Sequence, residues 1–389
     1  MDGSVNRVGA ATGHRRTGLR TARPWLLAAL GLAGGCRGEH VIGILDGGVE
    51  STASDGSTQD STGSLTLGTD STGDASGGAT SSPTGDGPAQ CGAPPGHTVC
   101  DFDDDPFHAI GLGCEGAPTD TQPIVAPRLE SADPDAWRVF REYGNPQWTP
   151  TEGSRMLALT TGTLPPVDDS DRIEIPLGVT DAADGSNDNP DGVALPAPVV
   201  PQPGSQGGAG GEPFVDCDGV GDCSDSLPTP WDAGGPANDL VWLAFDIDVP
   251  PDTFGYRVDL AWFSAELPAR HTEPGTDLVV WWQSSEAFTG NVATLAGAPL
   301  SAFGVADWVA QQGLLGNDPP LFGTGFDGTT GLPCDVAGSD FVDCPRGGAT
   351  GWLELRGPSL PGERMSITVA VLDLLDDHRD TTVLLDDWR

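Results

Sequence analysis

The sequence predicts an all-β fold, a β-sandwich or jelly-roll-like domain with long loops. Short runs of alternating apolar and polar residues recur along the chain, and Gly, Pro, Asn and Asp separate them. The chain also contains 35 prolines, which suit turn-rich connections better than helices. Sandwiches and jelly rolls are built from many such short strands, whereas α/β folds alternate strands with helices.

The clearest strand pattern spans residues 240–249, where every second residue is apolar and Asp246 and Asp248 lie between them. Because strand side chains alternate between faces, such a segment has one buried and one polar face. The pattern recurs in residues 173–179, 256–262, 365–372 and 381–385. We expect the last two segments to form a C-terminal hairpin.

Three segments depart from this alternation. Residues 278–282 are apolar on both faces, which is typical of a central strand covered on both sides. Its adjacent residues Trp281 and Trp282 should point to opposite faces, with one of them in the core. Residues 300–312 favour a helix, and the Pro/Gly-rich residues 190–211 predict a long surface loop.

The N-terminus resembles the signal of an exported lipoprotein. A basic segment precedes an apolar run of about a dozen residues, which is too short to span a bilayer of roughly 30 Å. The run ends in Ala33-Gly34-Gly35-Cys36, similar to the sequence before a lipidated cysteine, although leucine is commoner than alanine at the first position. We expect a lipid on Cys36. The alternatives are an ordinary signal peptide cut nearby, or a start codon placed too early.

The sequence then divides into three parts. Residues 1–35 are the predicted signal peptide, and residues 36–90 are rich in Ser, Thr, Gly and Asp, a composition that cannot bury apolar surface. We interpret them as a disordered tether. Residues 91–389 are predicted to form a single acidic β-sandwich domain.

Acidic residues outnumber basic ones by 57 to 18, and the formal net charge is −39. Five arginines and one acid precede Cys36, which leaves 13 basic and 56 acidic residues for the exported part. Such a surface repels nucleic acid and favours cations, and it also keeps an exported protein soluble. We therefore expect no nucleic-acid partner. The expected partners are the membrane, through the lipid, and an extracellular glycan or protein.

Seven further cysteines follow Cys36, and an exported domain is expected to oxidise them. Their spacing predicts two local disulfides, one between Cys217 and Cys223 and one between Cys334 and Cys344. Cys91, Cys100 and Cys114 compete for a third bridge, and one of the three is left over. Zinc is the rival interpretation, but the sequence has no Cys-x-x-Cys motif.

Several segments in order resemble the choice-of-anchor L domain, a bacterial surface family that carries one domain on various anchoring devices. The similarity covers about residues 100–300. Its matching segments are 109–114, 145–162, 222–227 with Trp231, 238–242, Gly290-Asn291 and the signature Phe263-Ser264-Ala265-Glu266-Leu267-Pro268. The chain has Leu267 where the family has tyrosine, and Pro274-Gly275-Thr276-Asp277 where the family has Tyr-Asn-Asp. The resemblance implies a surface module and no particular reaction.

Three acidic clusters are candidate calcium sites, because calcium takes six to eight oxygen ligands from carboxylates and carbonyls in turns. None matches an EF-hand loop, and a solvated turn in a very acidic protein is the simpler interpretation of each cluster. The first contains Asp101, Asp103, Asp104 and Asp105; the second contains Asp216, Asp218, Asp222 and Asp225; the third contains Asp373, Asp376, Asp377 and Asp380.

No motif indicates catalysis. The chain lacks Gly-x-Ser-x-Gly and His-Glu-x-x-His, and the histidines of the domain, at positions 97, 108, 271 and 378, are isolated in sequence. A non-catalytic binding or structural module is therefore the leading hypothesis. The alternative is a secreted glycoside hydrolase, for which Glu266 is the carboxylate to inspect and exposed tryptophans would be the sugar platforms.

Overall fold

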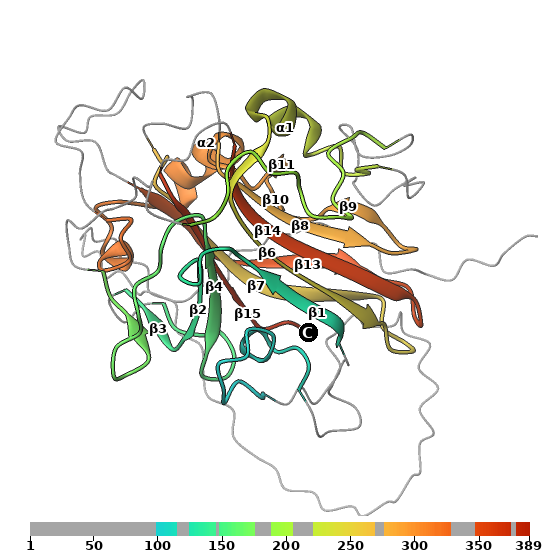
Figure 1. Cartoon of the computed structure of the whole chain (residues 1–389), viewed down its shortest axis with the longest axis horizontal. Coiled ribbons are helices and arrows are strands. Elements are labelled where there is room, and N and C mark those ends of the chain that lie inside the picture. The colour runs from blue at the N-terminus through green and yellow to red at the C-terminus, as the bar shows by residue number, and fades with distance from the viewer. Residues whose placement is uncertain are drawn as a thin grey trace, which may run out of the picture. The chain divides into compact units, whose positions relative to one another are not determined.

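Two antiparallel sheets form the body of the domain in the computed structural model (Figure 1). The structure describes residues 99–114, 124–144, 148–175, 188–204, 221–268, 276–327, 347–374 and 379–389. The predicted all-β sandwich is confirmed. None of the helices in these residues is long and apolar enough to cross a membrane.

The first sheet has five strands in the order β1-β6-β14-β8-β9. Its central strand, β14, pairs with β6 on one side and with β8 on the other. The strands are β1 (Ile124–Glu130), β6 (Ala237–Asp248), β8 (Leu278–Ser284), β9 (Thr289–Asn291) and β14 (Arg364–Leu374).

The second sheet has six strands in the order β12-β13-β7-β15-β4-β2. Here β7 and β15 lie at the centre and pair with each other. The strands are β2 (Trp137–Phe140), β4 (Met156–Thr160), β7 (Gly255–Ser264), β12 (Leu314–Leu315), β13 (Gly348–Pro358) and β15 (Thr381–Asp386).

The remaining elements are short. The parallel pair β3 (Glu142–Tyr143) and β5 (Arg172–Ile173) and the antiparallel pair β10 (Thr294–Leu295) and β11 (Ala298–Pro299) lie outside the main sheets. The helices are η1 (His108–Ile110), α1 (Pro228–Gly234), α2 (Ala302–Gln312) and η2 (Pro319–Leu321). The predicted helix at 300–312 is confirmed, and the Ser301 hydroxyl caps its start by accepting the Gly304 amide at 3.0 Å.

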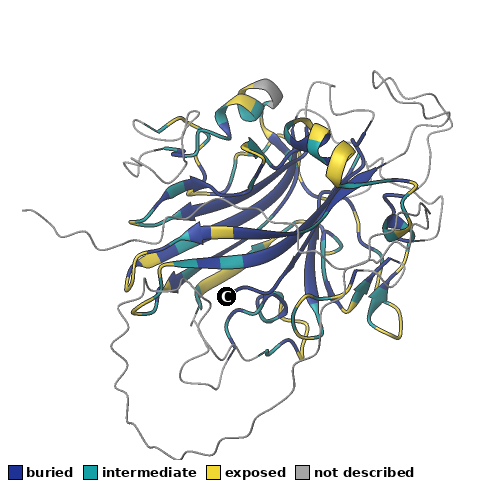
Figure 2. Ribbon diagram, turned by 180° about the vertical axis from the view of Figure 1, so that it is seen from behind, coloured by how far each residue is buried: buried dark blue, intermediate teal, exposed yellow. Residues whose placement is uncertain are grey.

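Apolar side chains fill the space between the sheets and also cover both outer faces. The alternate residues of β6, Val241 to Ile247, join the central core with residues of β7, β14 and β15. A second cluster lies on the outer face of the six-stranded sheet around Phe263, and a third lies on the outer face of the five-stranded sheet around Trp282. Burial therefore runs along most of both sheets (Figure 2).

This layering corrects one expectation and confirms another. Trp281 and Trp282 do point to opposite faces, because they belong to different clusters. Both are fully buried, however, so the expectation that only one would be core was wrong. Residues 193–199 pack on the outer face of the five-stranded sheet, and that cover explains why residues 278–282 are apolar on both faces.

The expected C-terminal hairpin was also wrong. The strands β14 and β15 form as predicted, but β14 belongs to the five-stranded sheet and β15 to the six-stranded sheet. The connection between them therefore crosses from one layer to the other. The chain also changes sheets between β6 and β7 and between β7 and β8. Alternation reports which face of a strand is buried and does not report which neighbour it pairs with.

The predicted strand at 173–179 forms only in part. Ile173 ends β5, Glu174 and Ile175 lie outside any strand, and the rest of that segment lies outside the described residues. The predicted loop at 190–211 is a loop as far as residue 204. Isolated bridges at Val193 and Pro203 connect it to neighbouring segments.

Candidate functional site

The site begins with strand ends that meet at one end of the sandwich. Ser264, the last residue of β7, lies opposite Thr381, the first residue of β15. In the other sheet, Leu278 at the start of β8 lies opposite Leu372, and Asn238 in β6 lies opposite Asp373. The β7–β8 and β14–β15 connections therefore cross between the layers at the same end, and the Ala265 amide donates to the Asp380 carbonyl at 3.1 Å.

Five carboxylates lie at this end, and all five are buried. They come from β6, from the β7–β8 connection, from the end of β14 and from the β14–β15 connection. We call Asp239, Glu266, Asp277, Asp373 and Asp380 the carboxylate cluster. Burying a carboxylate is unfavourable unless hydrogen bonds or opposite charge compensate for lost hydration, so the surroundings of each one matter.

Asp277 links the two layers. Although it directly precedes β8 in the five-stranded sheet, its Oδ2 accepts hydrogen bonds from the hydroxyls of Ser264, at 3.3 Å, and Thr381, both in the six-stranded sheet. Its own amide donates to Oε2 of Glu266 at 3.1 Å. The family-like signature from Phe263 to Pro268 thus forms the turn that holds Asp277 in place.

The surroundings of the Asp373 carboxylate differ from those of Asp277. Its side chain is 1% exposed, and neither of its carboxylate oxygens accepts a hydrogen bond from a donor in the described structure. Burial raises the pKa of this carboxyl well above its ordinary value, and the charge of Asp277 and a contact with its carboxyl add to the effect. The charges of Asp380 and Asp239 raise that pKa further.

Backbone features place the other two aspartates. Between Asn238 and Val241 two residues of β6 oppose the single residue Leu372, which is a β-bulge, and Asp239 within it has φ of 51°. Bulges change the direction in which a side chain points. Asp380 lies against Gly162, where a Cβ would stand 2.1 Å from its Oδ2. Only glycine leaves room for that carboxylate.

The third predicted calcium cluster is thus divided. Asp373 and Asp380 come together, whereas Asp376 and Asp377 lie outside the described residues. Sequence reasoning missed Asp239 and Asp277 as their neighbours, although Asp239 lies in a segment that carries the family resemblance and Asp277 ends the segment that departs from it. The sequence signal that could have found this cluster is an acidic residue close to the end of each of four strands.

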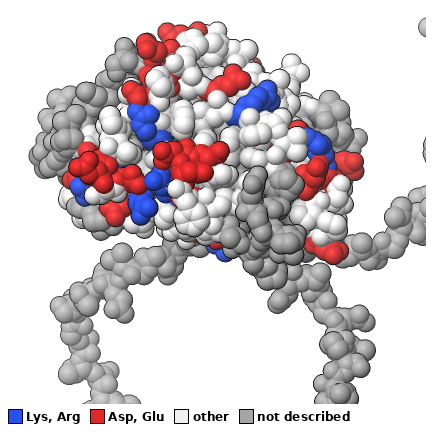
Figure 3. All heavy atoms as spheres, turned by 60° about the horizontal axis from the view of Figure 1, so that its bottom comes forward, with Lys and Arg blue, Asp and Glu red and all other residues white. Residues whose placement is uncertain are grey.

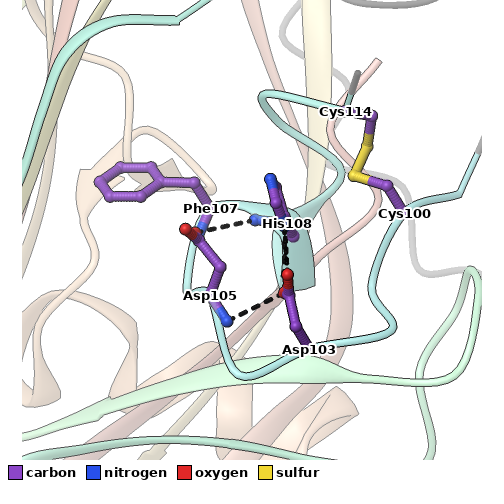
Figure 4. Close-up of a disulfide and its surroundings, with 6 residues drawn as sticks. All are labelled: Cys100, Asp103, Asp105, Phe107, His108 and Cys114. Carbon is purple, nitrogen blue, oxygen red and sulfur yellow. Dashed lines mark hydrogen bonds and ion pairs between the residues drawn. A yellow bond between two sulfur atoms is a disulfide. The ribbon is translucent and has the colours of Figure 1, made fainter. Parts of the chain in front are cut away.

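The first predicted cluster is used in local structure. Asp105 Oδ1 accepts the amides of Phe107 and His108, and Asp103 accepts His108 Nδ1 at 3.0 Å (Figure 4). Asp104 pairs with Arg155. Asp101 is buried, and its Oδ2 accepts the amides of Ser154 and Arg155. Asp103 and Asp105 therefore serve contacts with His108, and Asp101 and Asp104 serve contacts with Arg155.

The second cluster is described only in part. Asp222 is fully buried, and its two oxygens accept the amides of Ser224, Ser226 and Leu227 and the hydroxyl of Ser224. Burial raises the pKa of this carboxyl above its ordinary value despite those hydrogen bonds. Asp225 accepts the Gly204 amide at 3.0 Å. Asp216 and Asp218 lie outside the described residues.

Cys100 and Cys114 form a disulfide (Figure 4). This result selects one pairing from the three cysteines that competed in sequence, and it leaves Cys91 outside the described residues. Cys223 is also disulfide-bonded. Because Cys100 and Cys114 pair with each other, the partner of Cys223 lies outside the described residues, as do Cys217, Cys334, Cys344 and Cys36, so those predictions stay open.

On the face shown in Figure 3, arginines lie among carboxylates. Arg257 contacts Glu354 at 2.6 Å, Arg155 contacts Asp171 at 2.9 Å, and Arg364 contacts Asp246 at 3.1 Å. Arg128 instead lies over the ring of Trp242, 5.4 Å from its centroid. Because the arginines already have partners, the acidic excess determines the sign of the surface charge.

All ten tryptophans after the predicted signal lie in the described residues, and each is buried or half-buried. They pack in the apolar clusters or beside them, which does not suit the sugar platforms of the alternative hypothesis. In the described part of the chain, no group of three or more His, Cys, Asp or Glu side chains is arranged to hold a metal ion. Comparisons with protein-family models, curated proteins and solved structures gave no significant match.

Proposed function

We propose that this protein is a lipid-anchored surface protein that displays a non-catalytic β-sandwich module with a binding or structural role. The observation that carries the proposal is the position of Glu266. A glycosidase needs two carboxylates that reach the scissile bond of a bound sugar. Glu266 is only 2% exposed, and its Oε2 accepts the Asp277 amide and the Thr276 hydroxyl. These contacts suit a side chain that shapes a turn.

The sequence supports the anchoring part of the proposal. Cys36 follows a short apolar run, and the Ser/Thr/Gly/Asp-rich residues 36–90 would hold the domain away from the membrane as a flexible tether. The resemblance to choice-of-anchor L domains agrees with display at a bacterial outer membrane or cell surface. The proposed partners are an extracellular glycan or protein, and the acidic surface argues against nucleic acid.

Anchoring is tested with the full chain and the Cys36→Ser variant in a bacterium that processes lipoproteins. We expect the parent chain to partition into detergent with an acylated Cys36, and the variant to appear in the soluble fraction. Mass spectrometry that finds an unacylated mature N-terminus elsewhere would contradict the anchoring.

The function of the module is tested with the purified Cys36→Ser chain on a glycan array, with calcium and with chelator, and in parallel by release of reducing sugar from the same glycans. Binding to a glycan on the array without release of reducing sugar supports a binding module. If the parent chain releases sugar and Glu266→Gln does not, the glycoside hydrolase hypothesis replaces the binding-module hypothesis.

A further inference from the structure

Asp373 is the starting point, because it is a buried carboxylate without a hydrogen-bond donor. It extends from the end of β14 opposite Asn238, next to the bulge that contains Asp239. Two neighbouring acids, Asp277 and Asp380, lie in the two connections that cross between the layers. A buried carboxylate in such surroundings needs either a proton or a cation.

The fixed contacts of Asp277 favour a cation. Its Oδ2 accepts two hydroxyls, from Ser264 and Thr381, and hydrogen bonds of this kind stabilise the ionised form of a carboxyl. These two contacts fix the position of the Asp277 carboxylate beside Asp373. The atoms that the described residues offer to a cation here are carboxylate and hydroxyl oxygens. Such ligands suit hard divalent cations, and calcium in particular.

We propose that the carboxylate cluster binds a divalent cation of the calcium class, with Asp373 and Asp277 as its central ligands. Asp239 and Asp380 supply further oxygens from β6 and from the β14–β15 connection. The cation ties the two interlayer connections together across the end of the sandwich. This inference does not depend on the proposed function, because it concerns the folded domain alone.

Binding requires the side chains to move, since no three of these carboxylates are placed to hold a metal ion in the described structure. No donor group fixes the carboxylate of Asp373, and it contacts the carboxyl of Asp277, so these two ligands adjust together. Asp380 is already close, because Gly162 leaves it room. Calcium accepts six to eight ligands in flexible geometry, so it tolerates such adjustment better than magnesium does.

The test uses the Cys36→Ser full chain after chelator treatment, titrated with CaCl₂ or MgCl₂ by calorimetry and melted in each ion. We expect calcium to bind and to raise Tm by several degrees, because a ligand that binds only the native state stabilises it. Magnesium should bind at least tenfold more weakly. Asp373→Asn should abolish the calcium shift, and its calcium-free Tm should equal or exceed that of the parent because one charge is removed from the cluster.

Two variants separate binding from folding. Gly162→Ala keeps every carboxylate but displaces Asp380, so it should weaken calcium binding at least tenfold. Asp101→Asn makes the same chemical change at another buried aspartate that has one oxygen without a hydrogen bond, and it should keep the full calcium shift. The proposal is overturned if the parent binds no calcium and melts equally in calcium and chelator, which would leave a shared proton in the cluster. It is also overturned if Asp373→Asn folds and retains the full shift.

Discussion

The hydroxyl of Thr381, at the start of β15, donates a hydrogen bond to the carboxylate of Asp277, which precedes β8 in the opposite sheet. Both residues are buried, and 104 positions separate them in sequence. The bond connects the layers at the end where the chain crosses between them twice. A carboxylate in that position depends on its donors, because water does not replace them.

Replacing Thr381 with valine keeps the shape of the side chain and removes this donor. We expect the free energy of unfolding to fall by about 1.5–3 kcal/mol, the range for hydrogen bonds to charged groups. Denaturant unfolding in chelator measures it. The matched control is Thr382→Val, which removes the 2.9 Å bond between the neutral hydroxyls of Thr382 and Thr160 and should lower stability by about 1 kcal/mol. Equal losses in the two variants would show that the charge of Asp277 has no effect.

Removing the Cys100–Cys114 disulfide should also destabilise the domain. The two cysteines are 14 residues apart, and a closed loop of about 15 residues is expected to contribute about 3 kcal/mol by restricting the unfolded chain. The paired change Cys100→Ala with Cys114→Ala should lower the urea midpoint accordingly. The parent under mild reduction is the comparison; a midpoint unchanged in both would mean that the loop is already ordered without the bond.

The local pairings Cys217–Cys223 and Cys334–Cys344 stay predictions from spacing, because short loops close easily. Peptide mapping under non-reducing conditions should recover each pair within one peptide or two linked neighbours. Cys223 linked to any cysteine other than Cys217 would show that the spacing was misread.

Much of the fold was predictable because burial leaves a periodic mark on the sequence. The segments around β6, β7, β14 and β15 and helix α2 were all identified from periodicity. The pairing of those strands was not, since β14 and β15 are adjacent in sequence yet lie in different sheets. Strands such as β13, which contains Gly348, Gly351 and Gly357, have weak patterns and were missed.

The candidate site was harder to predict because it depends on that pairing. Asp373 and Asp380 are close in sequence and were grouped on that basis. Asp239 and Asp277 join them only because β6 pairs with β14 and because the β7–β8 connection crosses beside the β14–β15 connection. A chain with 57 acidic residues offers many clusters by sequence, and only burial distinguishes this one from solvated turns.

Asp386, at the opposite end of β15, provides a prediction about pH. Its side chain is buried, and Oδ2 accepts hydrogen bonds from the amide and hydroxyl of Thr151 and the amide of Glu152. Burial outweighs these bonds and raises the pKa of its carboxyl to about 7. Burial likewise raises the pKa of Asp387 to about 6, although the hydrogen bond from Arg389 opposes that shift.

The unfolded chain has an ordinary Asp386 pKa near 3.8. Between that value and about 7 the native state binds more protons than the unfolded state, so stability is greatest at the acidic side of this window and falls as pH rises through it. A shift of this size corresponds to about 4 kcal/mol between the two limits. Asp386→Asn, which keeps an acceptor oxygen, should therefore match the parent below the unfolded pKa of 3.8 and increasingly exceed it as the pH rises toward 7.5. Asp387 still titrates in the variant, so the free energy of unfolding of the variant should still change with pH. Denaturant unfolding in chelator at half-unit pH steps measures both curves, and parallel curves would show that Asp386 is ionised throughout the range.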